Sequence, residues 1–305
     1  MDKHRCAILV ATFNGEKYIR EQIISVLKQK DVDINIFISD DNSSDSTLEV
    51  LDKLNNNKIE VICSKPKGSA AKNFFNFFNK SFELKLKDYD FFALCDQDDI
   101  WPDDHLITSI ELIKKNKVDL TGSNVKTFGK NIEEKVIKYN QKQTEYDYLF
   151  QGLSPGFTFV FTKKLFSDLY INLKHFNDYN IEYHDWFIYS FARQKNYLSF
   201  VRDFHLMNYR QHENNHTGSK NSFKGILWRI KKIFNSDYKK IILRNSYLLK
   251  DVSGDSNFIT DLNEGKASIK KIIGAMIFSR RLIFERIITI IPILQIMFTR
   301  DDFNN

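Results

Sequence analysis

The sequence predicts an α/β fold with a mostly parallel central sheet, followed by a helical C-terminal region. Short apolar runs alternate with segments of helical periodicity over residues 1–124, and polar loops follow the apolar runs. From residue 222 onward, Lys, Arg, Ile and Phe dominate and turn signals are few. Strands that alternate with helices are joined by right-handed crossovers, which build a parallel sheet.

The elements of the first half follow in order. Each predicted strand is a short apolar run, and each predicted helix repeats its apolar residues at helical spacing. The predicted strands cover residues 6–12, 34–39, 58–63, 89–95 and 118–124, and the predicted helices cover 16–29, 71–82 and segments that begin near 47 and 102.

The second half is less regular. Residues 126–147 are polar and charged, and we expect them to form a loose connection. The segment GFTFVFTKKLF indicates a strand and then a helix, HDWFIYSFARQ a helix, and YLSFVRDFHLMNYRQH a strand pair or a strand and a turn. No internal repeat is present.

Composition limits the class of protein. The chain has 305 residues, 42% hydrophobic and 28% charged, which excludes a disordered protein. The net charge of +6 permits an acidic partner without identifying one. Cys6, Cys63 and Cys95 form no CxxC and lie in strand-like runs, which favours reduced core thiols in a cytoplasmic protein. We expect neither a signal peptide nor a membrane span, because no uncharged apolar run reaches roughly 18 residues.

Three polar loops follow predicted strands: TFNGEKY, SDDNSSD and CDQDD. In open α/β sheets, ligands bind outside the carboxyl ends of the strands, near a switch in strand order. The loops contain neither the GxGxxG fingerprint nor a P-loop. A nucleotide bound here would therefore need a metal ion to neutralise its phosphates.

Five carboxylates lie within nine residues of the stretch FFALCDQDDIWPDDHL: Asp96, Asp98, Asp99, Asp103 and Asp104. Like charges this close repel one another unless a cation lies among them. Asp96 and Asp98 at a strand end could hold Mg²⁺ or Mn²⁺ and leave positions for diphosphate oxygens. The alternative is a solvated acidic turn, and we prefer it for Asp103 and Asp104, which would lie at a helix N-terminus.

Two further acidic positions allow more than one interpretation. Asp40 and Asp41 could form a helix-capping loop, contact a base, or belong to a phosphatase-type Asp-x-Asp, which Asn42 argues against. Asp185 begins an apolar helix, where an Asp is usually a cap.

Five ordered motifs resemble the rhamnosyltransferase-type branch of the family 2 glycosyltransferases. The resemblance spans roughly residues 5–219 and rests on ILVATFNGEKYIREQIISVLKQ, IFISDDNSSDST, FFALCDQDDIWPDDHL, HDWFIYSFA and YRQHENNHTGS. It implies a GT-A fold, a Rossmann-like nucleotide-diphospho-sugar transferase fold, over residues 1–221. Residues 1–124 would form the nucleotide-sugar-binding half and 125–221 the acceptor half, with 222–305 as a basic amphipathic helical region.

The resemblance assigns the nucleotide-binding residues. Thr12 and Asn14 match positions that line the nucleotide, and Asp41 matches the residue that accepts from the pyrimidine N3–H. Phe13 stands where the family usually has Tyr. That departure removes a hydroxyl contact but keeps a ring that can stack on the base.

The resemblance also assigns the reaction centre. Asp98 matches the direct metal ligand, with Asp96 in the same metal motif and nearer the ribose. Asp185 matches the catalytic base of inverting members. Gln211 and His212 match a late motif near the diphosphate.

The implied activity is inverting, metal-dependent transfer of a sugar, rhamnose or another hexose, from a dTDP- or UDP-linked donor. The acceptor would be a lipid-linked glycan or an oligosaccharide in bacterial surface polysaccharide biosynthesis, such as O-antigen or capsule. One alternative is a sugar-nucleotide nucleotidyltransferase, which usually carries a glycine-rich basic loop that TFNGEKYIREQ lacks. The other is a basic membrane- or nucleic-acid-binding protein. We expect no nucleic-acid partner, since an acidic cleft repels phosphate unless a metal ion is bound, and the basic region lacks exposed aromatic residues arranged for base stacking.

The C-terminal region predicts a membrane-surface contact. FKGILWRIKKIF places apolar residues on one helical face and lysines off it, and Arg280, Arg281 and Arg286 interrupt a later Ile- and Phe-rich stretch. Basic amphipathic helices can lie on anionic lipid, so we expect a peripheral protein on the inner face of the cytoplasmic membrane. The alternative is packing on the catalytic domain or on a second subunit of a homo-oligomer.

Overall fold

The chain divides into two compact units. The computed structural model describes residues 3–63, 66–81, 83–130, 132–173, 181–212, 237–249, 252, 258–283 and 286–298. The first unit contains Met1–Asn140, Leu153–Ile188 and Asn196–Gln211, and the second contains Gln141–Gly152, Tyr189–Lys195 and His212–Asn305. The predicted boundary after residue 221 falls outside the described residues and stays a prediction.

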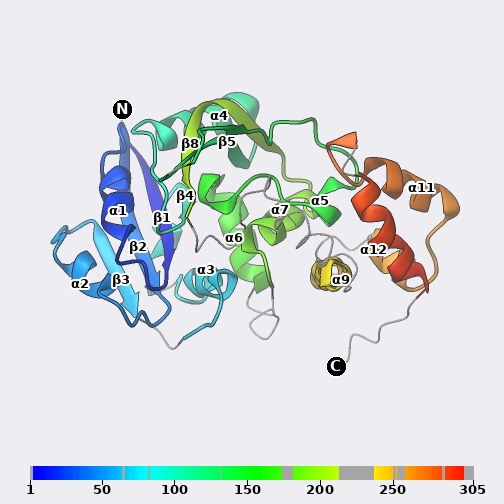
Figure 1. Cartoon of the computed structure of the whole chain (residues 1–305), viewed down its shortest axis with the longest axis horizontal. Coiled ribbons are helices and arrows are strands. Elements are labelled where there is room, and N and C mark those ends of the chain that lie inside the picture. Colours follow the sequence, from blue (N-terminus) through cyan, green and yellow to red (C-terminus); the bar gives the residue numbers. More distant parts are fainter. Residues whose placement is uncertain are drawn as a thin grey trace. The chain divides into compact units, whose positions relative to one another are not determined.

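The first unit is built on an eight-stranded mixed sheet (Figure 1). The strand order is β3-β2-β1-β4-β7-β5-β6, and β8 pairs with β5. β1 to β4 are mutually parallel, as are β5 and β8, whereas β6 and β7 are antiparallel to their neighbours. This confirms the predicted mostly parallel α/β sheet. The strands are β1 (His4–Thr12), β2 (Val32–Asp40), β3 (Ile59–Cys63), β4 (Phe91–Cys95), β5 (Leu120–Phe128), β6 (Val136–Ile137), β7 (Val160–Thr162) and β8 (Ser199–Arg210).

Helices fill the connections between the strands. Their apolar residues recur at helical spacing and bury one face, as Leu106, Ile110 and Ile113 do in α4. The helices of this unit are α1 (Ile19–Leu27), α2 (Thr47–Asp52), α3 (Ala70–Asn79), α4 (His105–Asn116), α6 (Lys163–Leu173) and the first turn of α7 (His184–Gln194), with 3₁₀ turns at Leu86–Asp88 and Gly156–Thr158.

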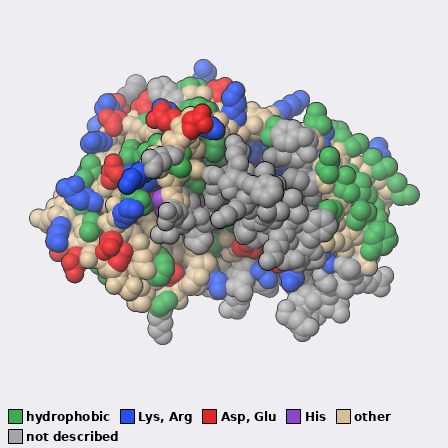
Figure 2. Space-filling model, in the orientation of Figure 1, with side chains coloured by type: hydrophobic (Ala, Val, Ile, Leu, Met, Phe, Trp, Pro, Cys, Tyr) green, Lys and Arg blue, Asp and Glu red, His purple; other side chains and the backbone are tan. Residues whose placement is uncertain are grey.

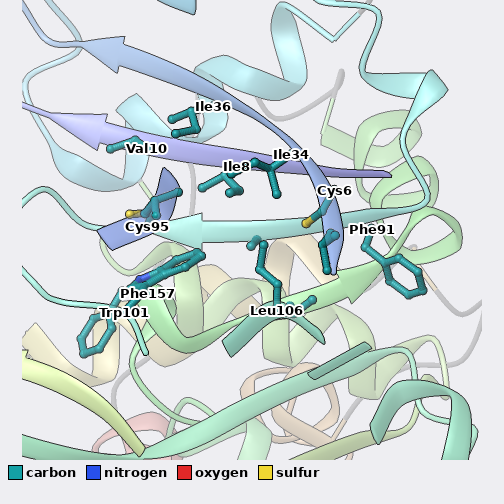
Figure 3. Close-up of a cluster of buried hydrophobic side chains, with 14 of the residues drawn as sticks. Cys6, Ile8, Val10, Ile34, Ile36, Phe91, Cys95, Trp101, Leu106 and Phe157 are labelled. Atoms are coloured by element: carbon teal, nitrogen blue, oxygen red, sulfur yellow. The ribbon is translucent and has the colours of Figure 1, made fainter. Parts of the chain in front are cut away.

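The core of this unit lies along the parallel strands (Figure 3). Cys6, Ile8 and Val10 occupy alternate positions of β1, so all three point to one face of the sheet and join the same buried cluster. Cys95 is also buried, which confirms a core position for two of the cysteines. Cys63 is exposed, so the prediction is wrong there, because β3 is an edge strand with one open side.

Two predictions for the second half are corrected. The connection expected from residue 126 begins later, because β5 continues to Phe128 and pairs with β6. The last segment is one 12-residue strand, β8, and not a strand pair. β8 pairs with β5 on both sides of a register shift, because Arg202 lies opposite Ser123 and Met207 lies opposite Val125. The extra residues of β8 at this shift account for the irregularity that resembled a turn.

Three parallel strands end at the same edge of the sheet. Thr12 at the end of β1 lies opposite Asp40 at the end of β2, and Val10 lies opposite Cys95 at the end of β4. β2 and β3 lie on one side of β1, and β4 lies on the other. The strand order therefore reverses at β1, which places the three polar loops at a switch point.

The second unit is helical. It contains α5 (Asp147–Phe150), the later turns of α7, α9 (Asp237–Leu249), α10 (Phe258–Asn263), α11 (Ile269–Phe278) and α12 (Arg286–Phe298). The buried carboxylate of Asp147 accepts from the Tyr189 hydroxyl at 3.0 Å and from Arg193 at 2.8 Å, with Arg281 at 3.5 Å. This cluster ties three separate segments together. None of the helices in the described part of the chain has the length and hydropathy to cross a membrane. The predicted basic helix over 223–234 lies outside the described residues.

Candidate active site

Gln97 joins the first polar loop to the acidic turn. Its Oε1 accepts from the Thr12 hydroxyl at 2.7 Å and from the Phe13 amide at 2.9 Å, and its Nε2 donates to the Phe13 carbonyl at 3.2 Å. A Cβ at Gly15 would lie 2.5 Å from Gln97 Oε1, so the glycine leaves room for this clamp. The sequence prediction missed Gln97, although it stands between the two candidate metal ligands.

Asn14 joins the first loop to the second. Its side-chain Oδ1 accepts from the Ser44 backbone amide at 2.9 Å, and its backbone amide donates to the Ser43 hydroxyl at 2.9 Å. Asn14 has a φ of 48°, a left-handed conformation that Asn tolerates better than most residues. The predicted nucleotide-lining side chain therefore already fixes the two loops against each other.

Asp41 anchors the loop that follows β3. Its Oδ2 accepts from the Gly68 amide at 3.0 Å, and its Oδ1 accepts from the Lys67 amide. A carboxylate has about four lone-pair positions, so these bonds leave capacity for the predicted base N–H. The neighbouring Asp40 is buried and accepts from both the amide and the hydroxyl of Ser43. That geometry favours the loop-capping interpretation of Asp40 over a phosphatase nucleophile.

Three predicted carboxylates meet at the end of β4. Burial and the negative charges of Asp98 and Asp185 together raise the pKa of Asp96 to about 8. The charge of Asp185, in the first turn of α7, thus acts on the acidic turn. The structure therefore unites residues that are 89 positions apart in the sequence.

Arg210 supports the acidic turn from β8. Its Nε donates to the Asp98 carbonyl at 2.8 Å, and its backbone amide donates to Asp99 Oδ1 at 2.8 Å. The guanidinium lies 4.7 Å from the Tyr18 ring centre and 4.6 Å from that of Phe128. The sequence prediction missed Arg210, because Asp98 and Asp99, to which it donates, are 112 and 111 positions away.

The first turn of α7 holds Asp185 among buried groups. Asp185 Oδ1 accepts from the Trp186 amide at 2.8 Å. The ring of the preceding His184 lies 4.0 Å from that of Phe74, and burial lowers the pKa of His184. A neutral, packed His184 fixes the start of the helix and hence the position of the carboxylate that follows it.

The last two predicted site residues follow β8. The Gln211 amide donates to the Phe128 carbonyl at 2.8 Å, which holds Gln211 beside the end of β5. His212 belongs to the portion of the chain that groups with the second unit. The roles of both residues stay predictions.

Comparison with known families decides the class of this site. The model of the family described as "Glycosyl transferase family 2" matches residues 7–174, more than half of the chain. The chain belongs to glycosyl transferase family 2. It is therefore a glycosyltransferase, and its matched region contains both polar loops and the acidic turn.

Curated relatives agree with this assignment. A dTDP-rhamnosyl transferase of Shigella flexneri, RfbG, is 36% identical over 276 residues, which cover 88% of this chain and 92% of the relative. A UDP-Glc:alpha-D-GlcNAc-diphosphoundecaprenol beta-1,3-glucosyltransferase of Escherichia coli, WfgD, is 28% identical over 148 residues, 46% of this chain and 56% of the relative.

Solved structures confirm the GT-A-like fold of this glycosyltransferase. TarS 1-349 of S. aureus in complex with UDP-GlcNAc has a TM-score of 0.56 and 17% identity, covering 96% of this chain and 90% of that one. The mannosyltransferase PcManGT from Pyrobaculum calidifontis, in complex with GDP-Man and Mn²⁺, has a TM-score of 0.53 and 12% identity. This match covers 99% of this chain and 89% of the mannosyltransferase chain. At these identities the likeness concerns the fold alone.

The acidic turn of the glycosyltransferase offers hard oxygen donors. Burial and the charges of Asp98 and Asp96 raise the pKa of Asp99, whose buried Oδ2 has no hydrogen-bond partner among the described residues. In that part of the chain, no group of three or more His, Cys, Asp or Glu side chains could hold a metal ion. Mg²⁺ is commonly held by one or two carboxylates together with substrate phosphates and water. The residues present therefore fit an ion that is shared with a diphosphate donor.

Gly156 gives a test of how Asp185 is positioned. A Cβ at this residue would lie 2.6 Å from His184 Nε2 and 3.1 Å from Asp185 Cβ. We expect Gly156→Ala to push the start of α7 away and to lower kcat at least about 100-fold, since small misplacements are costly. Donor binding, measured by calorimetry, should stay within about threefold, because the loops at Thr12 and Asp41 are unchanged.

A matched change is Gly68→Ala, where no atom lies within 4 Å of the added Cβ but φ is +76°. That variant strains the loop held by Asp41 and should weaken donor binding first. Equal loss of kcat in both variants, with equal donor affinities, would show that Gly156 does not act through Asp185.

Proposed function

We propose that this glycosyltransferase is an inverting, metal-dependent enzyme that transfers rhamnose or another hexose from a dTDP- or UDP-linked donor. Its acceptor is a lipid-linked glycan or an oligosaccharide in bacterial surface polysaccharide biosynthesis, such as O-antigen or capsule. The enzyme works at the inner face of the cytoplasmic membrane. The observation that carries the proposal is that Asp185, which lies against Gly156 in the same unit as the acidic turn, acts electrostatically on Asp96.

The relatives support the choice of donor and acceptor. The name of one relative includes a dTDP-rhamnosyl donor, and that of another includes UDP-glucose and a diphosphoundecaprenol-linked acceptor. Both names contain a pyrimidine nucleotide. A buried carboxylate such as Asp41 suits an N3–H of uracil or thymine, and the half-exposed ring of Phe13 can stack on the same base.

The two candidate ligands act on the diphosphate end of the donor. Asp98 and Asp96 would hold Mg²⁺ or Mn²⁺, which when bound stabilises the negative charge of the departing nucleoside diphosphate. Gln97 and Arg210 keep this turn fixed, because they bond it to the first loop and to β8. Gln211 and His212 are proposed to lie near the same diphosphate.

Asp185 acts on the acceptor. As the bond from the sugar to the diphosphate breaks, the anomeric carbon gains oxocarbenium character, as in glycoside hydrolysis. The acceptor hydroxyl oxygen attacks from the opposite face and its proton passes to the Asp185 carboxylate. One displacement forms one bond and breaks one, so the anomeric centre inverts.

A panel of sugar nucleotides tests the proposal. We expect slow hydrolysis of a dTDP- or UDP-linked hexose in Mn²⁺ or Mg²⁺, at least about tenfold faster than that of a GDP-linked sugar, since Asp41 would select a pyrimidine. Chelation with EDTA should abolish it. Release of nucleoside diphosphate and of free sugar is measured by chromatography. Unchanged turnover in EDTA would contradict the metal dependence. Conversion of the sugar nucleotide to nucleoside triphosphate and sugar 1-phosphate when pyrophosphate is added would indicate a nucleotidyltransferase instead.

A further inference from the structure

α12 is apolar on two opposite faces. Thr289, Ile293 and Ile296 are buried inside the second unit, whereas Ile287 and Phe298 are 69% and 79% exposed. A helix that only packed on its own unit would turn polar side chains outward. Packing in the core of this unit therefore does not explain why the outward face of α12 is apolar.

α11 continues this apolar surface. Ile269, Ile273 and Ile277 recur every four residues along one face and are 75%, 50% and 45% exposed. Ile283, between the two helices, is 75% exposed. We name the outward residues of α11, α12 and their connection the isoleucine face: Ile269, Ile273, Ile277, Ile283, Ile287 and Phe298. Hydrophobic side chains gather over α11 and α12 at the right of the view in Figure 2.

Charge indicates what covers this face. Residues 266–300 contain seven Lys or Arg residues and one Glu. Arg281 is buried against Asp147, Lys266 pairs with Glu264 at 2.6 Å and Lys271 pairs with Asp261 at 2.8 Å. Lys270 is exposed beside the isoleucine face. With Asp261 and Glu264 included, residues 258–300 still contain seven Lys or Arg residues and only three acidic ones. If two copies packed through this face, a twofold interface would set this excess of positive charge against its own counterpart. An anionic lipid surface has the opposite charge and an apolar layer beneath it.

We propose that the isoleucine face is the membrane-docking surface of this protein and that its partner is a bilayer with anionic headgroups. The isoleucines enter the boundary between headgroups and acyl chains, and the lysines contact the headgroups. The contact is interfacial, because the opposite face of α12 is buried inside the second unit. This proposal assigns membrane contact to α11 and α12. It rests on the proposed function, because a lipid-linked acceptor would lie in the same membrane.

Vesicle sedimentation with the full-length protein tests the proposal. The vesicles contain phosphatidylglycerol with phosphatidylethanolamine, or phosphatidylcholine alone. The variant I269Q/I283Q/I287Q changes three exposed side chains, and the control V136Q/I171Q/L198Q changes three side chains of the first unit that are 49%, 59% and 60% exposed. We expect the parent and the control to bind anionic vesicles, and the isoleucine variant to bind at least about tenfold more weakly. Phosphatidylcholine should bind the parent weakly, and salt should weaken binding to the anionic vesicles.

Donor hydrolysis without vesicles separates this proposal from the proposed function. The isoleucine variant should hydrolyse a sugar nucleotide at the rate of the parent, which also shows that it is folded. Equal vesicle binding by the variant and the parent overturns the docking surface, as does equal binding to both vesicle types. A parent dimer that the variant dissociates, without any vesicle binding, assigns the face to a second copy and also overturns it. If the parent itself hydrolysed no sugar nucleotide, that result would contradict the proposed function and not the docking surface.

Discussion

Asp98→Asn is expected to lower kcat/KM for transfer by about 1,000-fold and to abolish the metal dependence of donor binding. The change keeps the size of the side chain but removes the charge that a hard cation requires. Arg210 donates to the backbone carbonyl of Asp98, a bond that the substitution leaves in place, so the turn should keep its shape. Calorimetry with UDP- and dTDP-sugars, with and without Mn²⁺, measures the effect. The parent should bind the donor more tightly with the ion, whereas the variant should show the same weak affinity in both conditions.

Asp103→Asn provides the matched control. Asp103 belongs to the same acidic stretch, but it is exposed and pairs with Lys30 at 3.4 Å on the surface. An exposed pair of this kind contributes little, so the control should keep both metal response and turnover within about twofold. If Asp98→Asn behaved like this control, the acidic turn would not be the metal site.

The position of the site was predictable, because it depends on short-range signals. β1, β2 and β4 are apolar runs that end at polar loops, and parallel strands bring such ends to one edge. The edge status of β3 is not a local property, and Cys63 was therefore assigned to the core incorrectly. β8 was misjudged for a similar reason, since its regularity depends on pairing with β5.

The residues that fix the site were not predictable from local pattern. Gln97 and Arg210 act through partners that lie 85 and 112 positions away in the sequence. Their side-chain types alone do not reveal such partners, because Gln and Arg are usually surface residues. The exposure of the isoleucine face was hidden as well, since a repeat of Ile at helical spacing predicts a buried face as readily as a lipid-binding one.

Asp185→Asn should separate donor binding from transfer. The amide cannot take a proton from the acceptor hydroxyl, so we expect kcat for transfer to fall at least about 1,000-fold. Donor affinity should stay within about twofold or rise slightly, because one negative charge near Asp96 is removed from a site that binds a diphosphate. Asp185 Oδ1 accepts from the Trp186 amide, and the side-chain oxygen of Asn can accept the same bond, so α7 should start as before.

Glu182→Gln is the control for this change, since Glu182 is an exposed carboxylate three residues earlier in the chain. For both variants we would measure the rate of transfer to a lipid-linked acceptor and, separately, the affinity for the donor. Comparing the loss of transfer with the loss of donor affinity isolates the step in which Asp185 acts. A neutralised Glu182 should leave both quantities unchanged. Full transfer by Asp185→Asn would remove Asp185 from the mechanism, and an equal loss of donor affinity and transfer would mean that it binds the donor. If Asp185 is the catalytic base, Asp185→Asn should bind the donor normally but should not transfer the sugar.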